Sequence, residues 1–168
     1  MSHWRSDPNG FNESVIHEFR ANGGVVGGEL AGIPLLLLTT IDARSGQPRT
    51  TPLVYHRRGN RYLVIASNGG AARDPGWFRN LERDPVVAVE VGVETFAATA
   101  TILEASERDA VFASIVAEAP SAGAFQATAG RTIPVIELGP RLGGAAPESN
   151  RQSVGLPTAS KSPRPGAG

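Results

Sequence analysis

The sequence predicts a mainly β domain with flanking helices, an α+β fold in which a small antiparallel barrel or curled sheet carries helices on its outside. About six short segments between residues 35 and 138 have the length and apolar pattern of strands. Hairpin-like turns join most of them, and only about three helical segments are present. A doubly wound parallel sheet needs a helix between most successive strands, so the sequence excludes that fold.

The first elements are one helix and one strand. Residues 11–21 are predicted to form a helix, capped by Asn9 or Asn12 and ended by the glycines at positions 23 and 24. Its apolar face comprises Phe11, Val15, Ile16 and Phe19. Residues 35–41 are predicted to form a strand, and a polar turn follows over residues 42–48.

The next segments predict a hairpin and a short helix. Residues 49–57 and 61–67 are expected to pair as two strands around the turn at Gly59. Asp74 and Pro75 fit the cap and the first position of the short helix. The inward-facing residues of this helix are expected to be Trp77, Phe78 and Leu81.

A second hairpin, a second long helix and a closing strand complete the predicted fold. Residues 86–91 and 95–103 are expected to pair around Gly92, and residues 133–138 are expected to form the last strand. Ser106 is expected to cap the helix that lies between them. The apolar face of that helix comprises Val111, Phe112, Ile115 and Val116.

Composition excludes several classes of protein. The 168 residues, of which 40% are apolar, suit a single domain with a real core. The absence of cysteine excludes disulfides, and three scattered histidines argue against a metal site. A formal charge of zero argues against a nucleic-acid partner. No stretch is apolar and long enough for a transmembrane helix, and the first seven residues do not resemble a secretory signal. We expect a cytoplasmic protein, with peripheral membrane contact left open.

The composition changes sharply after Pro140. Residues 141–168 contain five glycines and four prolines, but only three large aliphatic residues. Such a segment buries too little apolar surface to offset the entropy of ordering its chain. We therefore expect a folded domain over residues 1–140 and a disordered tail over residues 141–168.

Two loops contain the residue types that bind anions. In the first, residues 43–52, Arg44 and Arg49 flank one tight turn, where their guanidinium groups can contact a phosphate together with Ser45 and backbone amides. The spacing alone fits an ordinary solvated turn as well. In the second, residues 67–80, two glycines precede a helix start, where free N–H groups and the helix dipole favour an anion.

Five segments of the chain occur in an order that is familiar from one enzyme family. They are residues 34–40 (PLLLLTT), 45–53 (SGQPRTTPL), 66–70 (ASNGG), 75–81 (PGWFRNL) and 131–134 (RTIP). Together they resemble the deazaflavin-dependent nitroreductase family, which uses coenzyme F420, over about residues 11–138. The resemblance implies a split β-barrel of the flavin and deazaflavin oxidoreductase superfamily.

The resemblance also implies which residues bind the cofactor. The phosphate and oligoglutamate tail would meet Arg44, Ser45 and Arg49, and the following strand would line the cofactor with Thr50, Thr51, Pro52, Leu53 and Val54. Ile65, Ala66, Ser67 and Asn68 would lie along the ring system. The start of the short helix would hold the tail through Gly76, Trp77, Phe78, Arg79 and Asn80. Arg73 or Arg79 would replace basic residues that relatives often carry at positions 43 and 68.

The implied chemistry is hydride transfer from the reduced deazaflavin to a quinone-like, enone or nitro acceptor, with the cofactor supplying the difficult step. Ser67 is the candidate for orienting substrate or cofactor through its hydroxyl. The substrate pocket is expected to include Ala119, Ala122 and Phe125, where relatives that reduce bulky nitro compounds often carry tyrosines. No metal is expected, and His56 is expected to be a packing or surface residue.

Other functions remain open from the sequence. The same fold also binds FMN, so the chain can be read as an FMN-dependent reductase. The small side chains of the expected pocket also fit a non-catalytic carrier of a deazaflavin or a lipid-like ligand, and a barrel without any ligand is the remaining alternative. In the enzyme reading the partner is a small-molecule electron acceptor, and the chain is a monomer or a homodimer.

Overall fold

Seven antiparallel strands form one sheet in a computed structural model of the chain, which describes residues 8–141. The strands are β1 (Leu35–Ile41), β2 (Pro48–Val54), β3 (His56–Arg58), β4 (Arg61–Ile65), β5 (Val86–Val91), β6 (Glu94–Ile102) and β7 (Val135–Pro140). Their order across the sheet is β2-β1-β5-β6-β7-β4-β3. The two edge strands, β2 and β3, are neighbours in sequence.

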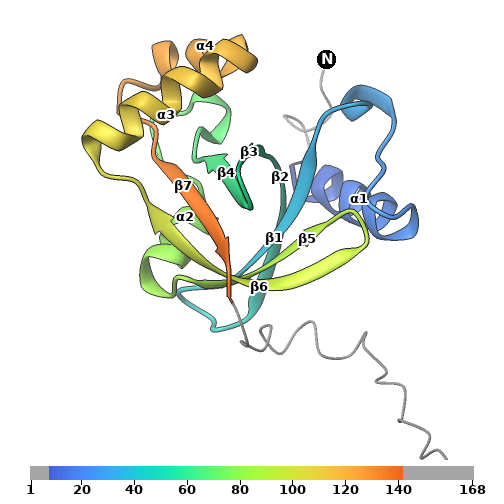
Figure 1. The fold of residues 1–168 in the computed structure, drawn as a ribbon. Helices are drawn as coiled ribbons and strands as arrows, with labels where there is room; N and C mark the ends of the chain where they lie inside the picture. The colour runs from blue at the N-terminus through green and yellow to red at the C-terminus, as the bar shows by residue number, and fades with distance from the viewer. Residues whose placement is uncertain (1–7, 142–168) are drawn as a thin grey trace, which may run out of the picture.

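The sheet curls into a split barrel (Figure 1). One residue, Tyr55, separates the end of β2 from the start of β3. Because β2 and β3 lie at opposite edges of the sheet, a one-residue connection requires these edges to meet at that corner. The backbone N–H of Tyr55 donates to the carbonyl oxygen of Pro34 at 3.2 Å, which fastens the corner to the chain entering β1.

Four α-helices surround the described barrel (Figure 1). They are α1 (Pro8–Ala21), α2 (Gly76–Arg83), α3 (Ala105–Glu118) and α4 (Pro120–Ala129), and two short 3-10 helices, η2 (Gly28–Leu30) and η3 (Asn68–Gly70), lie in loops. The α3–α4 pair lies on one side of the barrel and α1 lies on the other. Helix α2 contributes Trp77, Phe78 and Leu81 to the cluster of buried side chains inside the barrel.

Alternation along the strands separates this inner core from two outer cores. In β1, Leu36 and Leu38 belong to the inner cluster, whereas Leu35 and Leu37 pack with α1 residues such as Phe19. In β4 and β7 the outward side chains instead pack against α3, where Leu63 and Val135 contact the cluster of Phe112 and Ile115. Both faces of β1 are therefore buried, which explains its uninterrupted run of leucines.

The predicted fold class is confirmed, with corrections to the number and pairing of elements. The described residues form seven strands and four helices rather than about six and three, because the expected strand 49–57 is interrupted at Tyr55 and residues 120–129 form α4. Strand β4 pairs with β3 and with β7, whereas β2 pairs with β1 in the register Thr39↔Thr50. The expected hairpin of 49–57 with 61–67 is therefore wrong for its first half, because barrel closure is a tertiary requirement.

The predicted helix caps are also corrected. Asn9 and Asn12 both lie inside α1, which includes Pro8. The residue that caps α2 is Pro75 rather than Asp74, and the residue that caps α3 is Glu104 rather than Ser106. Neither cap makes a side-chain hydrogen bond to the helix. The predicted tail over residues 141–168 lies outside the described residues, except for Arg141.

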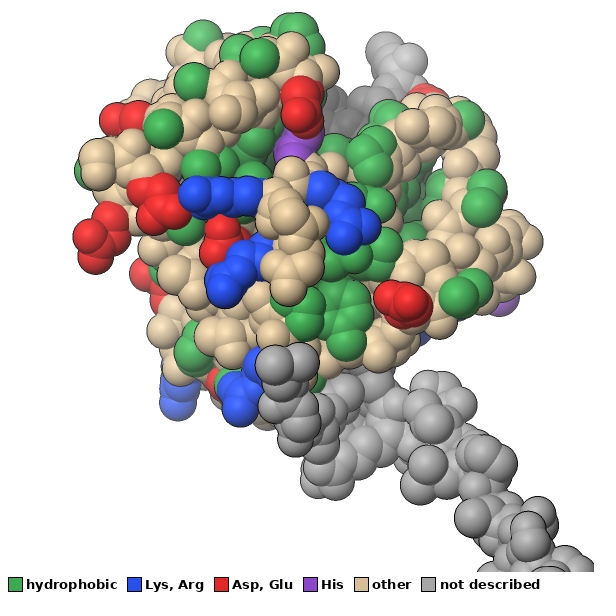
Figure 2. Space-filling model, viewed as in Figure 1, with side chains coloured by type: hydrophobic (Ala, Val, Ile, Leu, Met, Phe, Trp, Pro, Cys, Tyr) green, Lys and Arg blue, Asp and Glu red, His purple; other side chains and the backbone are tan. Residues whose placement is uncertain are grey.

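Basic and acidic side chains lie side by side over the β3–β4 hairpin (Figure 2). Glu137 of β7 is 9% exposed, and its carboxylate pairs with Arg61 at 2.8 Å and Arg58 at 3.3 Å. A carboxylate this buried needs such partners because its desolvation is costly. The ion pairs of these two arginines therefore serve to stabilise the hairpin.

No helix in the described part of the chain is long and apolar enough to cross a membrane.

Gly24 provides a test of how the α1–β1 connection packs on the β5–β6 turn. It has a φ of +90°, and a Cβ added to it would lie 2.7 Å from the Cα of Gly92. Gly24→Ala should lower the free energy of unfolding by about 1–2 kcal/mol for the backbone conformation and by about 1–3 kcal/mol more for the overpacking. Gly28→Ala is the matched control, because Gly28 has a φ of +63° but nothing within 4 Å of the added Cβ. Urea unfolding of both variants measures the difference, and equal losses would contradict this packing.

Candidate active site

A cleft of about 700 Å³ opens between the β1–β2 turn, residues 42–47, and the β4–α2 loop, residues 66–75. Its lining comes from four parts of the chain: Asn9 and Asn12 of α1, then Asp42, Arg49, Thr51, Pro52 and Leu53, then Ile65, Ser67, Asn68, Gly69, Arg73, Asp74 and Pro75, and finally Gly76, Trp77, Arg79 and Asn80. The two loops that the sequence singled out therefore face the same space. We call it the large cleft.

Asp42 organises the β1–β2 turn. One of its carboxylate oxygens accepts hydrogen bonds from the backbone N–H groups of Arg44 at 2.9 Å and Ser45 at 2.8 Å. The other oxygen lies 3.5 Å from Nε of Arg49. These contacts favour the ionised form, so the pKa of Asp42 is lowered, chiefly by the backbone hydrogen bonds from Ser45 and Arg44.

The backbone amides of this turn are all occupied. Besides the two that Asp42 accepts, the N–H of Ala43 donates to Oδ1 of Asn80, that of Gly46 to the carbonyl oxygen of Asp42, and that of Gln47 to Oγ of Ser45. The prediction that these amides complete the coordination of a phosphate is therefore wrong. An anion can meet this turn only through side chains.

Arg44 and Ser45 line a separate hollow on the other side of Asp42. This side hollow has a volume of about 490 Å³ and also contains Arg83 and Asp84. Asp42 is the residue that the side hollow shares with the large cleft. The structure thus separates Arg44 from Arg49, and Arg49 is the arginine of this turn that faces the large cleft.

Asn80 connects α2 to the β1–β2 turn. Its side chain is buried, its Nδ2 donates to the hydroxyl of Thr40 at 3.1 Å, and its Oδ1 accepts the N–H of Ala43 at 3.0 Å. Arg83, one turn further along α2, donates to the carbonyl oxygen of Ala43 at 2.8 Å. Because both contacts hold Ala43, the turn and the helix form one wall of the cleft.

The β4–α2 loop is shaped by unusual backbone conformations. Asn68 has a φ of +48°, and its Nδ2 donates to the carbonyl oxygen of Arg73 at 3.0 Å. Gly70 has a φ of +83°, and an added Cβ would collide with the hydroxyl of Thr128 on α4. Glycine at position 70 therefore allows the loop to pass close to α4.

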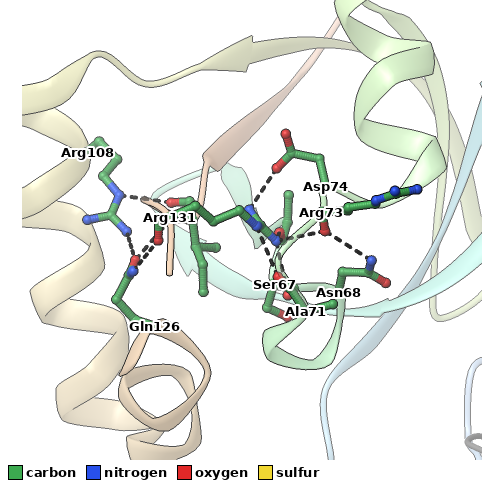
Figure 3. Close-up of polar contacts among 10 residues, drawn as sticks. Ser67, Asn68, Ala71, Arg73, Asp74, Arg108, Gln126 and Arg131 are labelled. Carbon is green, nitrogen blue, oxygen red and sulfur yellow. Dashed lines mark hydrogen bonds and ion pairs between the residues drawn. The ribbon is translucent and has the colours of Figure 1, made fainter. Parts of the chain in front are cut away.

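Arg131, which follows α4, holds the β4–α2 loop (Figure 3). Its guanidinium group donates to the carbonyl oxygens of Ala66, Ser67, Ala71 and Arg73 at 3.0–3.3 Å. It also pairs with the Asp74 carboxylate at 2.7 Å. The planar fork of arginine suits this set of acceptors, and in this way the carbonyl groups of a loop without strand pairing gain hydrogen-bond donors.

A second network holds the chain segment that carries Arg131. Arg108 of α3 is buried and donates to the carbonyl oxygen of Ile133 at 2.9 Å and to Oε1 of Gln126 at 2.8 Å. Gln126 of α4 in turn accepts the N–H of Ile133 and donates to the carbonyl oxygen of Arg131 (Figure 3). The helical pair therefore supports the segment that positions the cleft loop.

The donor set of the large cleft suits a ligand with several negative charges. Arg49, Arg73 and Arg79 line it and are exposed, so their guanidinium groups are accessible. The two carboxylates in the lining already have partners: Asp74 pairs with Arg131, and Asp42 accepts two backbone amides. The N–H groups of Gly76 and Trp77, at the start of α2, have no acceptor in the described part of the chain.

A smaller, apolar pocket adjoins the large cleft. It has a volume of about 190 Å³ and shares Pro52, Leu53, Ile65 and Ser67 with the cleft. Its other lining residues are Val54, His56, Ala119, Ser121, Ala122 and Phe125. Ser67 thus lies at the junction of a polar, basic space and an apolar one.

The structure brings together most of the predicted site residues. The large cleft contains Arg49, Thr51, Pro52, Leu53, Ile65, Ser67, Asn68, Gly76, Trp77, Arg79 and Asn80, and the apolar pocket contains Val54 with Ala119, Ala122 and Phe125. Five predicted residues line neither space. Thr50 hydrogen-bonds Thr39 across the β1–β2 pair at 2.8 Å, whereas Ala66 and Phe78 are buried in the inner core. Arg44 and Ser45 lie in the side hollow.

Several residues of the site were missed by the sequence argument. Asn9 and Asn12 were expected only as helix caps, but they line the large cleft. Asp42 and Arg131 have their roles through contacts with distant backbone groups, and no local pattern reports such contacts. In the sequence, Arg131 stood out only as the first residue of the segment 131–134, one of the five that carried the resemblance. Arg73 or Arg79, by contrast, was expected to replace basic residues of relatives, and both line the cleft.

The fold and the site together define a class: a split-barrel oxidoreductase whose cleft suits an anionic redox coenzyme. Comparison with known proteins supports the same class. The family model of F420H(2)-dependent quinone reductases matches residues 13–140. An F420H(2)-dependent quinone reductase of Mycobacterium tuberculosis H37Rv is 38% identical over 144 residues, which cover 82% of this chain and 97% of that protein.

Two solved structures are similar as well. One, of an F420-H2 dependent reductase, is 33% identical with a TM-score of 0.57, over 62% of this chain and 93% of that chain. The other, described as a domain-swapped dimer, is 30% identical with a TM-score of 0.60, over 80% of this chain and 98% of that chain. The chain belongs to the F420H(2)-dependent quinone reductase family. The predicted fold, enzyme class and deazaflavin cofactor are thereby confirmed.

Arg131 offers a test of the loop support. Arg131→Lys keeps the positive charge but removes the fork that reaches four carbonyl oxygens, so the free energy of unfolding should fall by about 1.5–3 kcal/mol. Arg79→Lys is the matched control, because Arg79 is exposed, and it should change stability by less than about 0.5 kcal/mol. Urea unfolding compares the two variants. If Arg131→Lys were as stable as Arg79→Lys, the support that we assign to Arg131 would be wrong.

The lowered pKa of Asp42 predicts a pH-dependent contribution to stability. A carboxyl group whose pKa is lower in the folded state stabilises the fold above its unfolded-state pKa, and this contribution disappears as the pH falls through the folded-state pKa. The difference in stability between the wild type and Asp42→Asn should therefore be present at pH 7 and shrink in acid. Unfolding at a series of pH values measures it, with Glu13→Gln, which removes one exposed carboxylate, as control. A difference independent of pH would contradict the prediction.

Proposed function

We propose that this chain uses reduced F420 to reduce a quinone-type acceptor, with the cofactor in the large cleft and the acceptor in the apolar pocket. The observation that carries the proposal is the continuity of these two spaces. A basic cleft and an apolar pocket share Pro52, Leu53, Ile65 and Ser67, so a coenzyme with an anionic tail and an apolar acceptor can meet at one boundary. Family membership supplies the identity of the coenzyme.

The cofactor is assigned to the large cleft by charge. F420 carries a phosphate and an oligoglutamate tail, and the arginines of the cleft, at positions 49, 73 and 79, can each donate to such oxygens. The free N–H groups at the start of α2 add donors oriented along the helix dipole, which contributes about 0.3–1 kcal/mol more. When bound, the reduced deazaflavin supplies the hydride.

The residues at the junction position the reactants. Trp77 is 7% exposed and packed into the inner core, so it presents a fixed edge to the cleft. Pro52, Leu53 and Ile65 form an apolar wall common to both spaces, which suits the flat face of a ring system. The hydroxyl of Ser67 is the polar group at this boundary, so we assign it the orientation of cofactor or acceptor. Arg131 acts indirectly, because it holds the carbonyl group of Ser67.

The apolar pocket favours a quinone-type ring as the acceptor. On the side of α4, Ala119, Ala122 and Phe125 present side chains without hydrogen-bond donors, and Ser121 adds one hydroxyl. Such a wall binds an apolar conjugated ring chiefly through burial. Enones and nitro compounds remain candidates that an acceptor panel can rank.

Two alternatives lead to different outcomes in the same experiments. An FMN-dependent reductase would be yellow as isolated and would bind FMN more tightly than F420. A carrier of the deazaflavin would bind F420 but would not oxidise reduced F420 when quinones and nitroaromatic compounds are added. A domain-swapped dimer is described for one relative, and we infer that this chain is a monomer or a homodimer. A cytoplasmic location and the disordered tail stay predictions from the sequence.

Arg49 tests the placement of the cofactor. Arg49→Ala should weaken F420 binding by about 1.5–3 kcal/mol, because it removes a charge-assisted hydrogen bond from the cleft. Arg57→Ala is the control, because Arg57 is an exposed arginine of β3 that stacks on Tyr62 and does not line the cleft. Fluorescence titration with F420 at low and moderate salt measures both, and salt should weaken wild-type binding because the contacts are ionic. An unchanged Kd for Arg49→Ala would contradict the role in cofactor binding that we assign to Arg49.

A further inference from the structure

One wall of the apolar pocket contains a histidine paired with a carboxylate. His56 is the first residue of β3, and it follows the barrel corner at Tyr55. Its side chain is 13% exposed, lines the pocket, and has Nδ1 at 3.3 Å from Oε2 of Glu118. Glu118 is the last residue of α3, so the contact joins the edge of the barrel to the helical pair. The contact of Nδ1 leaves Nε2 without a partner in the described part of the chain.

His56 carries the imidazole of this pocket, the type of side chain that most often transfers protons in catalysis. The other polar side chains in the lining are the hydroxyls of Ser67 and Ser121, which are weaker proton donors. An imidazole can carry a proton on either nitrogen. The α4 side of the pocket has no phenol or carboxyl group that competes for the role.

Among the described residues a carboxylate, and no cation, contacts the imidazole of His56. The carboxylate of Glu118 is the charged group in contact with the imidazole. The two arginines that follow His56 are directed elsewhere: Arg57 lies over the ring of Tyr62 at 5.0 Å, and Arg58 pairs with Glu107 and Glu137. Across the β3–β4 pair the neighbour is Leu63, which is apolar.

Quinone reduction requires a proton as well as a hydride, if the proposed function holds. A quinone that accepts a hydride carries one negative charge, which lies on a carbonyl oxygen. It becomes a neutral hydroquinone only when that oxygen gains a proton. In an apolar pocket the charged form is poorly solvated, so a proton donor within reach stabilises the transition state.

We propose that His56 is the general acid of this reaction and that Glu118 is its positioning residue. The N–H bond at Nε2 breaks, an O–H bond forms on the acceptor, and the electron pair stays on the imidazole nitrogen. The neutral imidazole then takes a proton from solvent, and the oxidised cofactor releases one proton to solvent, so protons and electrons balance. Glu118 accepts from Nδ1–H, which fixes the tautomer and aims the other nitrogen at the pocket.

The kinetic test compares two histidines with menadione as the quinone probe. His56→Gln should lower kcat by about 100-fold or more, the contribution of a general acid, while KM and the Kd of F420 change little. The wild-type kcat/KM should decline toward alkaline pH, as the acid loses its proton, and this decline should be absent from His56→Gln. His17→Gln, on the exposed part of α1, is the matched control and should behave as wild type. Glu118→Gln should lower kcat less than His56→Gln, with an unchanged KM.

A second measurement does not depend on turnover. In protein loaded with oxidised F420, which has no electrons to donate, added menadione should shift the imidazole NMR signals of His56 and leave those of His17 in place. Unmoved His56 signals, or a His56→Gln variant that keeps its kcat and its pH profile, would overturn the proposal.

The design separates this inference from the function on which it rests. Wild-type protein that fails to bind F420 or to reduce any quinone contradicts the proposed function. Wild-type protein that does both, with a fully active His56→Gln variant, contradicts only the general acid. An unchanged Kd of F420 in His56→Gln shows that the variant is folded.

Discussion

The connection at Tyr55 is the constraint on which the arrangement of the site depends. Because one residue joins the two edge strands of a seven-stranded sheet, the sheet has to curl until its edges meet. Closure brings β2 beside the end of β4, although these strands do not pair with each other. Pro52 and Leu53 from one edge and Ile65 and Ser67 from the other thereby become common walls of two adjoining cavities. A flat sheet of the same strands would place them far apart.

Closure alone does not shape the cleft, because its two walls are loops without strand pairing. Two polar side chains hold these loops in place. Asn80 holds the β1–β2 turn against α2, and Arg131 satisfies the carbonyl groups of the β4–α2 loop. Both satisfy buried or partly buried backbone groups, for which an unmade hydrogen bond costs about 1–3 kcal/mol. The guanidinium groups of Arg73 and Arg79 in the cleft take no part in these contacts and stay available to a ligand.

The sequence predicted those parts of the fold that are determined locally. Strand β1 was predicted with its exact bounds because a run of leucines is buried on both faces, and β5 and β6 followed from a turn at Gly92 between alternating segments. The break at Tyr55 was not predictable, because it arises when distant edges meet. At the site, the residue types and the two loops were predicted, and the placement of Arg44 was not, because Asp42 turns that part of the loop toward a separate hollow. Contacts such as those of Arg131 with residues 66–74 leave no periodic pattern in a single sequence.

The division between a charged cleft and an apolar pocket separates two requirements that conflict in one space. Binding an anionic tail requires exposed guanidinium groups and water nearby, whereas a ring that accepts electrons binds best where water is excluded. An apolar pocket, however, stabilises poorly the charge that a hydride leaves on the acceptor. A proton donor at the pocket wall resolves this conflict, because it neutralises the charge as it forms. His56 meets that requirement through its place at the barrel corner, since the same connection that closes the sheet also brings β3 against the end of α3.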